Sequence, residues 1–343
     1  MSYLDFEITP DMKTLLKNTV SGDIGVSNKA SLELAVALEL PIKKGGIPGD
    51  TVGFIFAMPE FDPGQTPEWP TDIISPGTEK NYFAYSVPNT GKIPYCHVEG
   101  DYVMVPTFDV ATSLDWSRKF ARDARWDIVG RSFQVMEGNF TKKRNDDGHH
   151  TLISAGKGRG LIVYDSLATA GLFTKRVISL GKTVMRRNAG GNSTSVNQGK
   201  LTHLLMSPEG LEDIRSWDLT QVDDVTRREI FLNGEGEASL TKIFGVVLVD
   251  VDEYGENQVY QSYYEDVLGG TMSGSKVEIM VGLDLARGKT DSFVMPWRKQ
   301  PNGRLIELLP DPMLTRENRA GYYARVEYGV GCLDARRVLL LSF

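Results

Sequence analysis

A long stretch of the chain carries apolar residues at the spacing of an α-helix. Successive apolar side chains are three or four residues apart and therefore share one helix face: Trp126, Val129, Phe133, Met136 and Phe140. Thr112 and Ser113 precede this pattern, and the polar run Asn145–Gly148 follows it. We predict an unbroken helix over Leu114–Arg144, about 45 Å long at 1.5 Å per residue. Such a length is typical of a structural strut, with the five apolar residues as its core face.

Shorter patterns elsewhere predict a β-rich fold with many turns, in keeping with 35 glycines and 16 prolines. A second helix is predicted at Leu172–Arg187, and Ser207-Pro208 is typical of a helix start, with the helix reaching Trp217. The predicted strands are short and mostly apolar: Val52–Ala57, Tyr82–Ser86, Tyr102–Val105, Leu201–Met206, Ile243–Val251, Gln258–Tyr264, Lys276–Leu283, Ser292–Trp297, Leu305–Leu309, Gly321–Tyr328 and Arg336–Ser342.

Composition places the chain among ordinary folded proteins. Of its 343 residues 41% are hydrophobic and 24% charged, and the net charge of −7 gives no overall electrostatic footprint for DNA. Cys96 and Cys332 are far apart, which fits two reduced thiols and no metal spacing. The charged residues within Met1–Val20 exclude a signal peptide there, and no apolar run reaches the length of a membrane span.

Four short motifs resemble chemical sites, and each is better explained as a turn. Gly156–Gly160 lacks the ending of a phosphate loop, and Gly288-Lys289-Thr290 lacks its earlier glycine. Asp250–Gly255 resembles the opening of a calcium loop, but Gln261 stands where a bidentate Glu is needed. His149-His150 has no third ligand and is interpreted as a surface turn. We therefore expect no enzyme, no cofactor and no metal.

Charge is distributed unevenly between two neighbouring segments. Thr51–Ser113 holds eight acidic residues against two lysines, and Leu114–Arg144 holds eight basic residues against four acidic ones. Both segments can be solvated surface, which is the default interpretation. They are also complementary, so that one copy of the chain can dock on another.

The order of elements resembles the major capsid protein of tailed bacteriophages, the Hong Kong 97-type fold. The strand at Tyr102–Val105, the long helix and the Asp146-Asp147-Gly148 stop are similar to the strand, spine helix and following turn of that family. Leu201–Leu211, with its Ser-Pro pair, and Ser239–Val246 are similar to axial-domain segments. No single motif is diagnostic, and two separate helices, or strands, within Leu114–Arg144 would rule the resemblance out.

The resemblance implies an α+β fold with four parts. These are an N-terminal arm at 1–48, an extended β-hairpin loop at 49–97, a peripheral domain at 98–167 and 300–343 with spine helix 114–144, and an axial domain at 168–299. It further implies that the acidic loop of one copy lies over the basic helix region of the next. The residues expected at that contact are Arg118, Arg122, Arg125, Glu79, Glu99 and Asp101.

The implied function is that of a shell subunit. It would assemble with itself into pentamers and hexamers of an icosahedral virion capsid that encloses double-stranded DNA. Its other partners would be a portal and a separate scaffolding or decoration protein, with assembly in the host cytoplasm and no membrane. Two alternatives remain open: a nanocompartment shell protein of the same fold, and a soluble α+β enzyme or ligand-binding domain.

Overall fold

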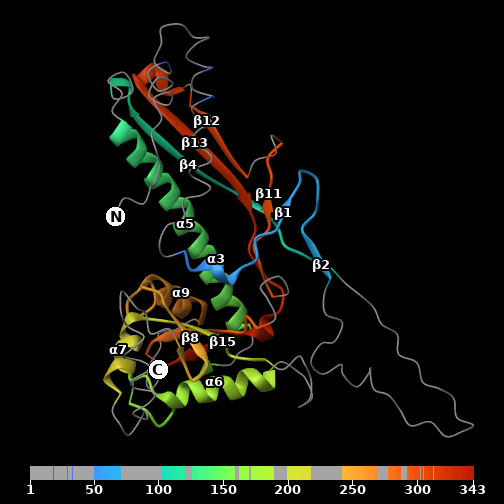
Figure 1. Ribbon diagram of the computed structural model, residues 1–343, viewed down its shortest axis with the longest axis vertical. Coiled ribbons are helices and arrows are strands. Elements are labelled where there is room, and N and C mark those ends of the chain that lie inside the picture. The colour runs from blue at the N-terminus through green and yellow to red at the C-terminus, as the bar shows by residue number, and fades with distance from the viewer. Residues whose placement is uncertain are drawn as a thin grey trace, which may run out of the picture. The chain divides into compact units, whose positions relative to one another are not determined.

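The computed structural model describes fifteen stretches and positions of the chain. They are Asn18, Lys29 and Glu33 singly, and residues 50–70, 102–119, 126–158, 162–169, 171–188, 199–217, 242–268, 277–286, 292–301, 303, 305–311 and 313–343. The chain forms two compact units (Figure 1). Unit 1 comprises Met1–Pro67, Val105–Gly148 and Met295–Val330, and unit 2 comprises Glu68–Met104, His149–Val294 and Gly331–Phe343.

Unit 1 is built on a five-stranded sheet with β13 at its centre. In order along the sheet, β1, β11, β13 and β12 are neighbours, and β4 also pairs with β13. β13 and β4 are antiparallel over ten residue pairs, from Arg319↔Ser117 to Tyr328↔Phe108. The strands are β1 (Glu60–Phe61), β4 (Phe108–Ser117), β11 (Trp297–Arg298), β12 (Ile306–Pro310) and β13 (Arg319–Tyr328). The short 3-10 helix η2 (Met313–Glu317) lies between β12 and β13 along the chain.

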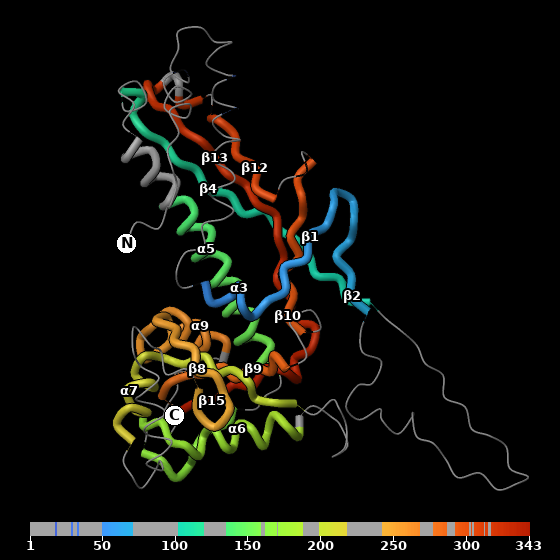
Figure 2. Tube along the Cα trace, in the orientation of Figure 1, coloured from blue at the N-terminus to red at the C-terminus, as the bar shows by residue number. Residues whose placement is uncertain are grey.

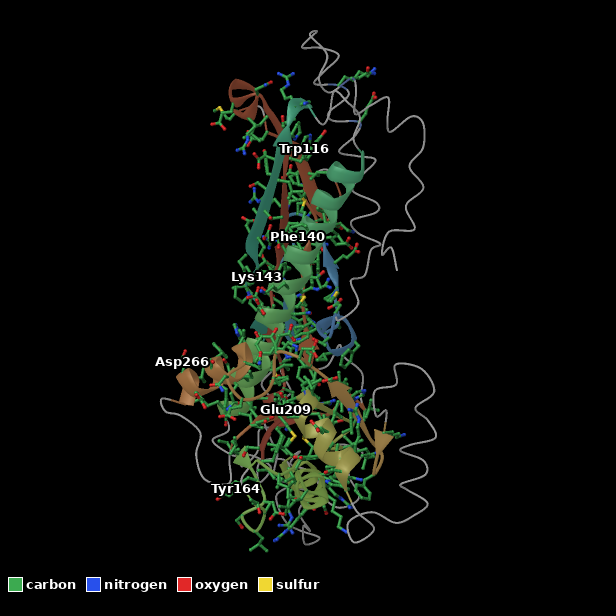
Figure 3. All side chains as sticks on the ribbon, turned by 90° about the vertical axis from the view of Figure 1, so that its left-hand side faces the viewer. Trp116, Phe140, Lys143, Tyr164, Glu209 and Asp266 are labelled. Carbon is green, nitrogen blue, oxygen red and sulfur yellow. The ribbon has the colours of Figure 1, made fainter. Side chains whose placement is uncertain are left out.

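The long helix exists, but its predicted bounds are wrong. α5 spans Trp126–Lys157, whereas Leu114–Ser117 is the end of strand β4. Val110, Thr112, Leu114 and Trp116 alternate with more exposed residues, which is the two-residue period of a half-buried strand. Thr112 and Ser113 are therefore strand residues and no helix start. Figures 1 and 3 both show β4 running beside the first part of α5.

The polar run Asn145–Gly148 does not stop the helix, because its side chains are used along the helix sides. Lys143 donates to Asp147 at 2.6 Å, one turn on, and the Tyr328 hydroxyl donates to the same carboxylate at 2.8 Å. Arg144 forms an ion pair with Asp50. A side chain at Gly148 would meet Val52, so glycine here allows α3 (Val52–Ile55) to pack closely against α5. It does not end the helix.

Unit 2 holds a six-stranded mixed sheet in the order β5-β15-β9-β6-β8-β7. β5–β15 and β6–β8 pair in parallel, and the remaining pairs are antiparallel. The strands are β5 (Ile162–Val163), β6 (His203–Met206), β7 (Lys242–Ile243), β8 (Val246–Asp250), β9 (Ile279–Leu283) and β15 (Val338–Ser342). The helices are α6 (Lys175–Asn188), α7 (Pro208–Ser216), α9 (Val259–Leu268) and the short η3 (Ala335–Arg337).

A continuous apolar core fills unit 2 between the sheet and the helices α6 and α7 (Figure 2). Phe173 is fully buried, stacks on Trp217 with ring centroids 5.8 Å apart, and meets Phe343 edge-on. The Trp217 indole donates to the Phe173 carbonyl at 2.9 Å, so its polar group is satisfied. The predicted helix start is confirmed: the Ser207 hydroxyl accepts from the Gly210 N–H, and Pro208 opens α7.

Most predicted strands of the C-terminal half are confirmed. Across the whole chain, three strand predictions are wrong. Val52–Ala57 contains the helix α3, and Gln258–Tyr264 lies mostly in α9, whose Tyr260 and Tyr264 face inward at helical spacing. Ile243–Val251 is a hairpin and no single strand, because Phe244 and Gly245 adopt positive φ and form its turn. Tyr82–Ser86 lies outside the described residues.

The two units divide the chain differently from the predicted domains. Gly331–Phe343 was expected in the peripheral domain, but β15 is the second strand of the unit-2 sheet. The loop was expected to begin at Gly49, yet residues 50–67 supply α3 and β1 to unit 1. Ala57 and Pro59 accept backbone hydrogen bonds from Met295 and Trp297, which fixes this segment beside β11. The predicted arm, apart from the three single positions, lies outside the described residues.

Candidate interaction surface

A small strand pair in unit 2 exposes consecutive apolar side chains. β2 (Glu68–Pro70) and β3 (Tyr102–Met104) pair in an antiparallel register, with Trp69 opposite Val103. Tyr102 is 67% exposed, Met104 58% and Val103 38%. Scattered exposed apolar residues are normal, whereas adjacent ones form a patch of the kind that marks an interaction site. We therefore take β2–β3 as the candidate interaction surface.

The two strands are the ends of one connection, residues 71–101, which lie outside the described residues. The predicted strand at Tyr102–Val105 is confirmed as β3, and it stands at the base of the predicted loop. Glu79, Glu99 and Asp101 belong to the part of the loop that is not described. Whether those carboxylates make the expected contacts stays a prediction.

A second cluster, which the sequence interpretation missed, lies where α5 packs on α9. His149 was expected in a surface turn, but it is fully buried inside α5. Its Nδ1 lies 3.1 Å from the Tyr254 hydroxyl, and its ring stacks on Tyr260 with centroids 4.6 Å apart. His150 stacks on Tyr263 at 3.9 Å. The signal was available: Tyr260, Tyr263 and Tyr264 recur at helical spacing and supply an aromatic partner for adjacent histidines.

Among the described residues no three His, Cys, Asp or Glu side chains are grouped so as to hold a metal ion. Burial, and then Asp334, raise the pKa of Cys332 to about 12, so its thiol stays protonated and unreactive. No described helix is both long and apolar enough to cross a membrane.

Solved structures share this fold across most of its length, although the sequence matches no family profile and no curated protein. A structure of Microbacterium phage Oxtober96 is similar with a TM-score of 0.56 and 10% identity, covering 87% of this chain and 92% of that one. The acid-stable capsid structure of Helicobacter pylori bacteriophage KHP30 is similar with a TM-score of 0.53 and 11% identity, with the same coverages. The capsid of a native GTA particle is similar with a TM-score of 0.53 and 12% identity, covering 87% of this chain and 92% of that one.

This chain has the fold of a phage capsid protein. The likeness extends over both units, so the expectation that a strand within Leu114–Arg144 would rule the resemblance out is wrong: Leu114–Ser117 is part of strand β4 in a chain that has this fold.

Only some of the site residues predicted from the sequence lie in the described part of this capsid fold. Arg118 is half-buried, and its backbone N–H donates to the Asn318 carbonyl beside β13. Arg122 and Arg125 lie outside the described residues. Of the predicted helix core, Met136 is fully buried and Phe140 half-buried. The side chains of three further core residues are not described: Trp126, Val129 and Phe133.

Two acids near the predicted contact already have partners within the chain. Asp109 binds Arg325 through two hydrogen bonds of 2.9 and 2.6 Å, and Asp115 lies 2.8 Å from Arg319. Both pairs are solvent-exposed and contribute only about 0–1 kcal/mol each. Asp109 belongs to Thr51–Ser113, so one acid of that segment is already paired with a base of the same chain, whereas Asp115 belongs to Leu114–Arg144.

Two buried titratable groups of α5 have opposite effects on stability. Burial, with help from His150, lowers the pKa of His149 to about 3, so its imidazole is neutral in the folded protein. Burial raises the pKa of Glu137 to about 7, and its Oε1 has no hydrogen-bond partner among the described residues. His149 disfavours folding at acid pH, whereas Glu137 disfavours it at neutral pH and above.

Acidification is expected to destabilise the capsid fold through His149. The unfolded chain binds the imidazole proton with a pKa near 6.5, so stability falls as the pH drops from about 6.5 towards 3. Urea unfolding of the subunit at pH 7, 6, 5 and 4 measures this slope. His149→Phe keeps the stack on Tyr260 but loses the bond to Tyr254. We expect it to be less stable at pH 7 and to have a shallower acid slope.

Glu137→Gln is the matched control for that measurement. The stabilising contribution of Glu137 to folding is fully present below about pH 4.5 and is lost as the pH rises through 7. Because this contribution grows as the pH falls from about 7 to 4.5 and so opposes the His149 effect, the Gln variant should lose stability more steeply on acidification than the wild type. An acid slope that is unchanged in His149→Phe would show that His149 does not control it.

Proposed function

We propose that this chain is the major capsid protein of a tailed double-stranded DNA bacteriophage. In this proposal it assembles with itself into pentamers and hexamers of an icosahedral shell around the genome. The observation that carries the proposal is the extent of the fold likeness, which covers 87% of this chain and 92% of the phage chains. A likeness over both units fits a whole shell subunit better than a shared domain of an enzyme.

The finer division of the Hong Kong 97-type fold is part of the proposal. Unit 1, with the β4–β13 sheet and the first part of α5, corresponds to the peripheral domain. Unit 2, with its six-stranded sheet and helices α6, α7 and α9, corresponds to the axial domain. The β2–β3 pair is then the base of the extended loop, and its exposed Tyr102 and Met104 are available to a second copy.

The remaining parts of the proposal concern location and partners. The protein would be a structural component of the virion, without catalytic activity, assembled in the host cytoplasm. A portal and a separate scaffolding or decoration protein would join it, and the packaged DNA would be bound without sequence preference. A nanocompartment shell differs from this proposal in enclosing protein cargo in place of a genome.

Electron microscopy of negatively stained purified protein tests the proposal directly. We expect closed icosahedral particles, or rings of five and six subunits that close under assembly conditions. Particles isolated from lysate that contain double-stranded DNA would favour the phage capsid, and particles filled with an enzyme would favour the nanocompartment. A protein that stays monomeric under all assembly conditions would contradict both.

Reversing the charge of Arg122 and Arg125 together is expected to impair assembly without unfolding the subunit. The reason is the proposed docking of the acidic loop of one copy on the basic region that precedes α5 in the next. Single surface pairs contribute about 0–1 kcal/mol, but they recur in every copy of a shell. Particle yield by electron microscopy and circular dichroism of the subunit are the measurements.

The salt dependence of that variant separates docking from other effects. Wild-type assembly should weaken as salt is raised, because exposed charges are screened within about 10 Å at 0.1 M. Normal shells of the double variant at both low and high salt would show that the loop does not dock there. Reversal of Arg319, whose acidic partner is in the same chain, is the control and should leave assembly intact.

A further inference from the structure

Strand β4 forms a long open edge of the unit-1 sheet. It spans Phe108–Ser117 and pairs with β13 along one side over ten residues. Figure 1 shows β13 between β4 and β12. The Arg118 N–H donates to the Asn318 carbonyl at 3.2 Å and continues the register of the β4–β13 pair. Residues of an antiparallel pair alternate between hydrogen-bonded and non-hydrogen-bonded positions, so the even-numbered residues of β4 are the ones that bond to β13.

The odd-numbered residues of β4 therefore direct their backbone N–H and C=O groups away from β13. They are Asp109, Ala111, Ser113, Asp115 and Ser117, and their side chains are all exposed. Their backbone groups have no hydrogen-bond partner among the residues that the structure describes. An edge strand with such a row of unpaired groups is a template on which another strand can add.

The strand on the other side of β13 is protected in a way that β4 is not. β12 has five residues, and the N–H of Asp311, directly after it, donates to the Gly321 carbonyl of β13. The alternation then places Pro310 at an outward position, where a proline blunts the edge because it has no N–H. β4 has ten residues and contains neither proline nor lysine. Of these two edges, β4 is the one that is open to pairing.

From this arrangement we infer that β4 pairs with β4 of a second copy of this chain, antiparallel and centred on Ser113. Both copies contribute the same strand, so the contact is isologous and joins two unit-1 sheets into one. The inference rests on the proposed function for its place in a shell, where it is a contact across a two-fold axis. The pairing itself is a property of the subunit and is tested on the subunit.

The sequence of β4 is complementary to itself in this register. When Ser113 lies opposite its own copy, Ala111 lies opposite the partner's Asp115, and Asp109 lies opposite the partner's Ser117. Every outward residue then enters a hydrogen-bonded pair, and no two carboxylates lie directly opposite each other. Centring on Asp115 would place two carboxylates opposite each other. Centring on Ala111 would leave Asp115 and Ser117 without a partner within β4.

The other face of β4 brings apolar side chains together across the contact. In the same register Val110 lies opposite the partner's Trp116, and Thr112 lies opposite the partner's Leu114. An aromatic residue opposite a β-branched one is a favourable cross-strand pair. Val110 and Leu114 are only half-buried within one copy, so the pairing covers more of their apolar surface.

The two carboxylates of β4 do not prevent this approach. Asp109 is bound by Arg325 and Asp115 by Arg319, both from β13 of the same copy, so they bring little net charge to the edge. Because the pairing uses backbone groups, it does not depend on these exposed ion pairs.

Opposite charges introduced at Ser113 test the pairing and its register together. Ser113→Lys alone and Ser113→Glu alone each place two like charges opposite each other, and each should weaken dimer formation about fivefold. An equimolar mixture of the two variants should form a mixed dimer at least as strong as the wild-type dimer, because each lysine then lies opposite a glutamate. Analytical ultracentrifugation of the unassembled subunit over a range of concentrations measures the dimer.

Tyr323→Lys is the matched control, because Tyr323 lies beside Ser113 on β13, partly exposed and one strand further from the contact. The two added charges are then about three strand spacings apart, roughly 14 Å, and are screened at 0.1 M salt. We expect this variant to dimerise as the wild type does. Ser113→Pro removes an N–H that β13 does not use, so it should weaken the dimer about tenfold and leave the circular dichroism of the subunit unchanged.

A wild-type subunit that stays monomeric at every concentration would overturn the inference, as would Ser113→Lys and Ser113→Glu variants that each dimerise like the wild type. Variants that are weakened alone and are not restored in the mixture would show that β4 pairs with a different segment or in a different register, which also overturns it.

Electron microscopy of the same preparations separates this inference from the proposed function. If the wild type and both charged Ser113 variants alike form closed particles, the shell function stands and the β4 pairing is wrong. If the dimer behaves as expected but no preparation forms particles, the proposed function fails and the β4 pairing stands.

Discussion

Replacing both Tyr102 and Met104 by Asp is expected to abolish shell formation while leaving the subunit folded. Both side chains are mostly exposed in the single chain, so the added charges would be solvated there. In the proposed assembly they become part of a buried interface, where an unpaired carboxylate is strongly unfavourable. Because every copy carries the change, the loss applies at each contact in the shell.

Particle counts by electron microscopy and the unfolding midpoint of the subunit together check this expectation. The control is Leu167→Asp/Met313→Asp, which adds the same two charges at apolar residues that are 78% and 74% exposed in other places. We expect the control to assemble. Normal particles from the Tyr102→Asp/Met104→Asp variant would show that the β2–β3 patch is not an interface, even if the protein forms a shell by other contacts.

The sequence predicted the unit-2 elements well where local signals and burial agree. Leu201–Met206 is a mostly apolar segment that contains the strand β6, and Ser207-Pro208 has the side-chain cap and fixed φ that begin α7. The terminal strand β15 is buried on both faces and therefore has a continuous apolar sequence.

The start of the long helix was misplaced because the helix was extended back to Leu114, behind Thr112 and Ser113, although its apolar stripe begins only at Trp126. Phe108–Ser117 instead alternates with period two, as a half-buried strand does. Ten pairings with β13 decide in favour of the strand, and these long-range contacts cannot be read from the segment itself. At the other end, Asp147 prolongs the helix through bonds to Lys143 and to the distant Tyr328.

The candidate surfaces were predictable only in part, for a related reason. Adjacent histidines at His149 give no sign of burial until α9 supplies the tyrosines that cover them. Helix α6 is visible in the sequence as a helical pattern, but only the fold shows that its apolar side is used by the core of unit 2.

Gly321→Val is expected to destabilise unit 1 by about 3 kcal/mol, the upper part of the range for overpacked sites. A Cβ atom at this buried position would meet the Leu114 carbonyl oxygen of β4, and it would lie 2.6 Å from Leu314 Cδ1. The clash with backbone cannot be relieved by a rotamer change, so β4 and β13 must separate locally. β13 is the centre of the unit-1 sheet, and the distortion therefore reaches β11 and β12 as well.

Urea unfolding of the unassembled subunit measures this effect as a fall in the midpoint. Tyr323→Val is the matched control, since residue 323 is two positions along β13 on the same face and is 37% exposed. Valine is favourable in strands, so the control should keep a midpoint close to that of the wild type. A Gly321→Val subunit that unfolds at the wild-type midpoint would contradict the ten-pair register of β4 and β13. The placement of Leu114 in a strand, which corrects the predicted helix start, would then have to be abandoned.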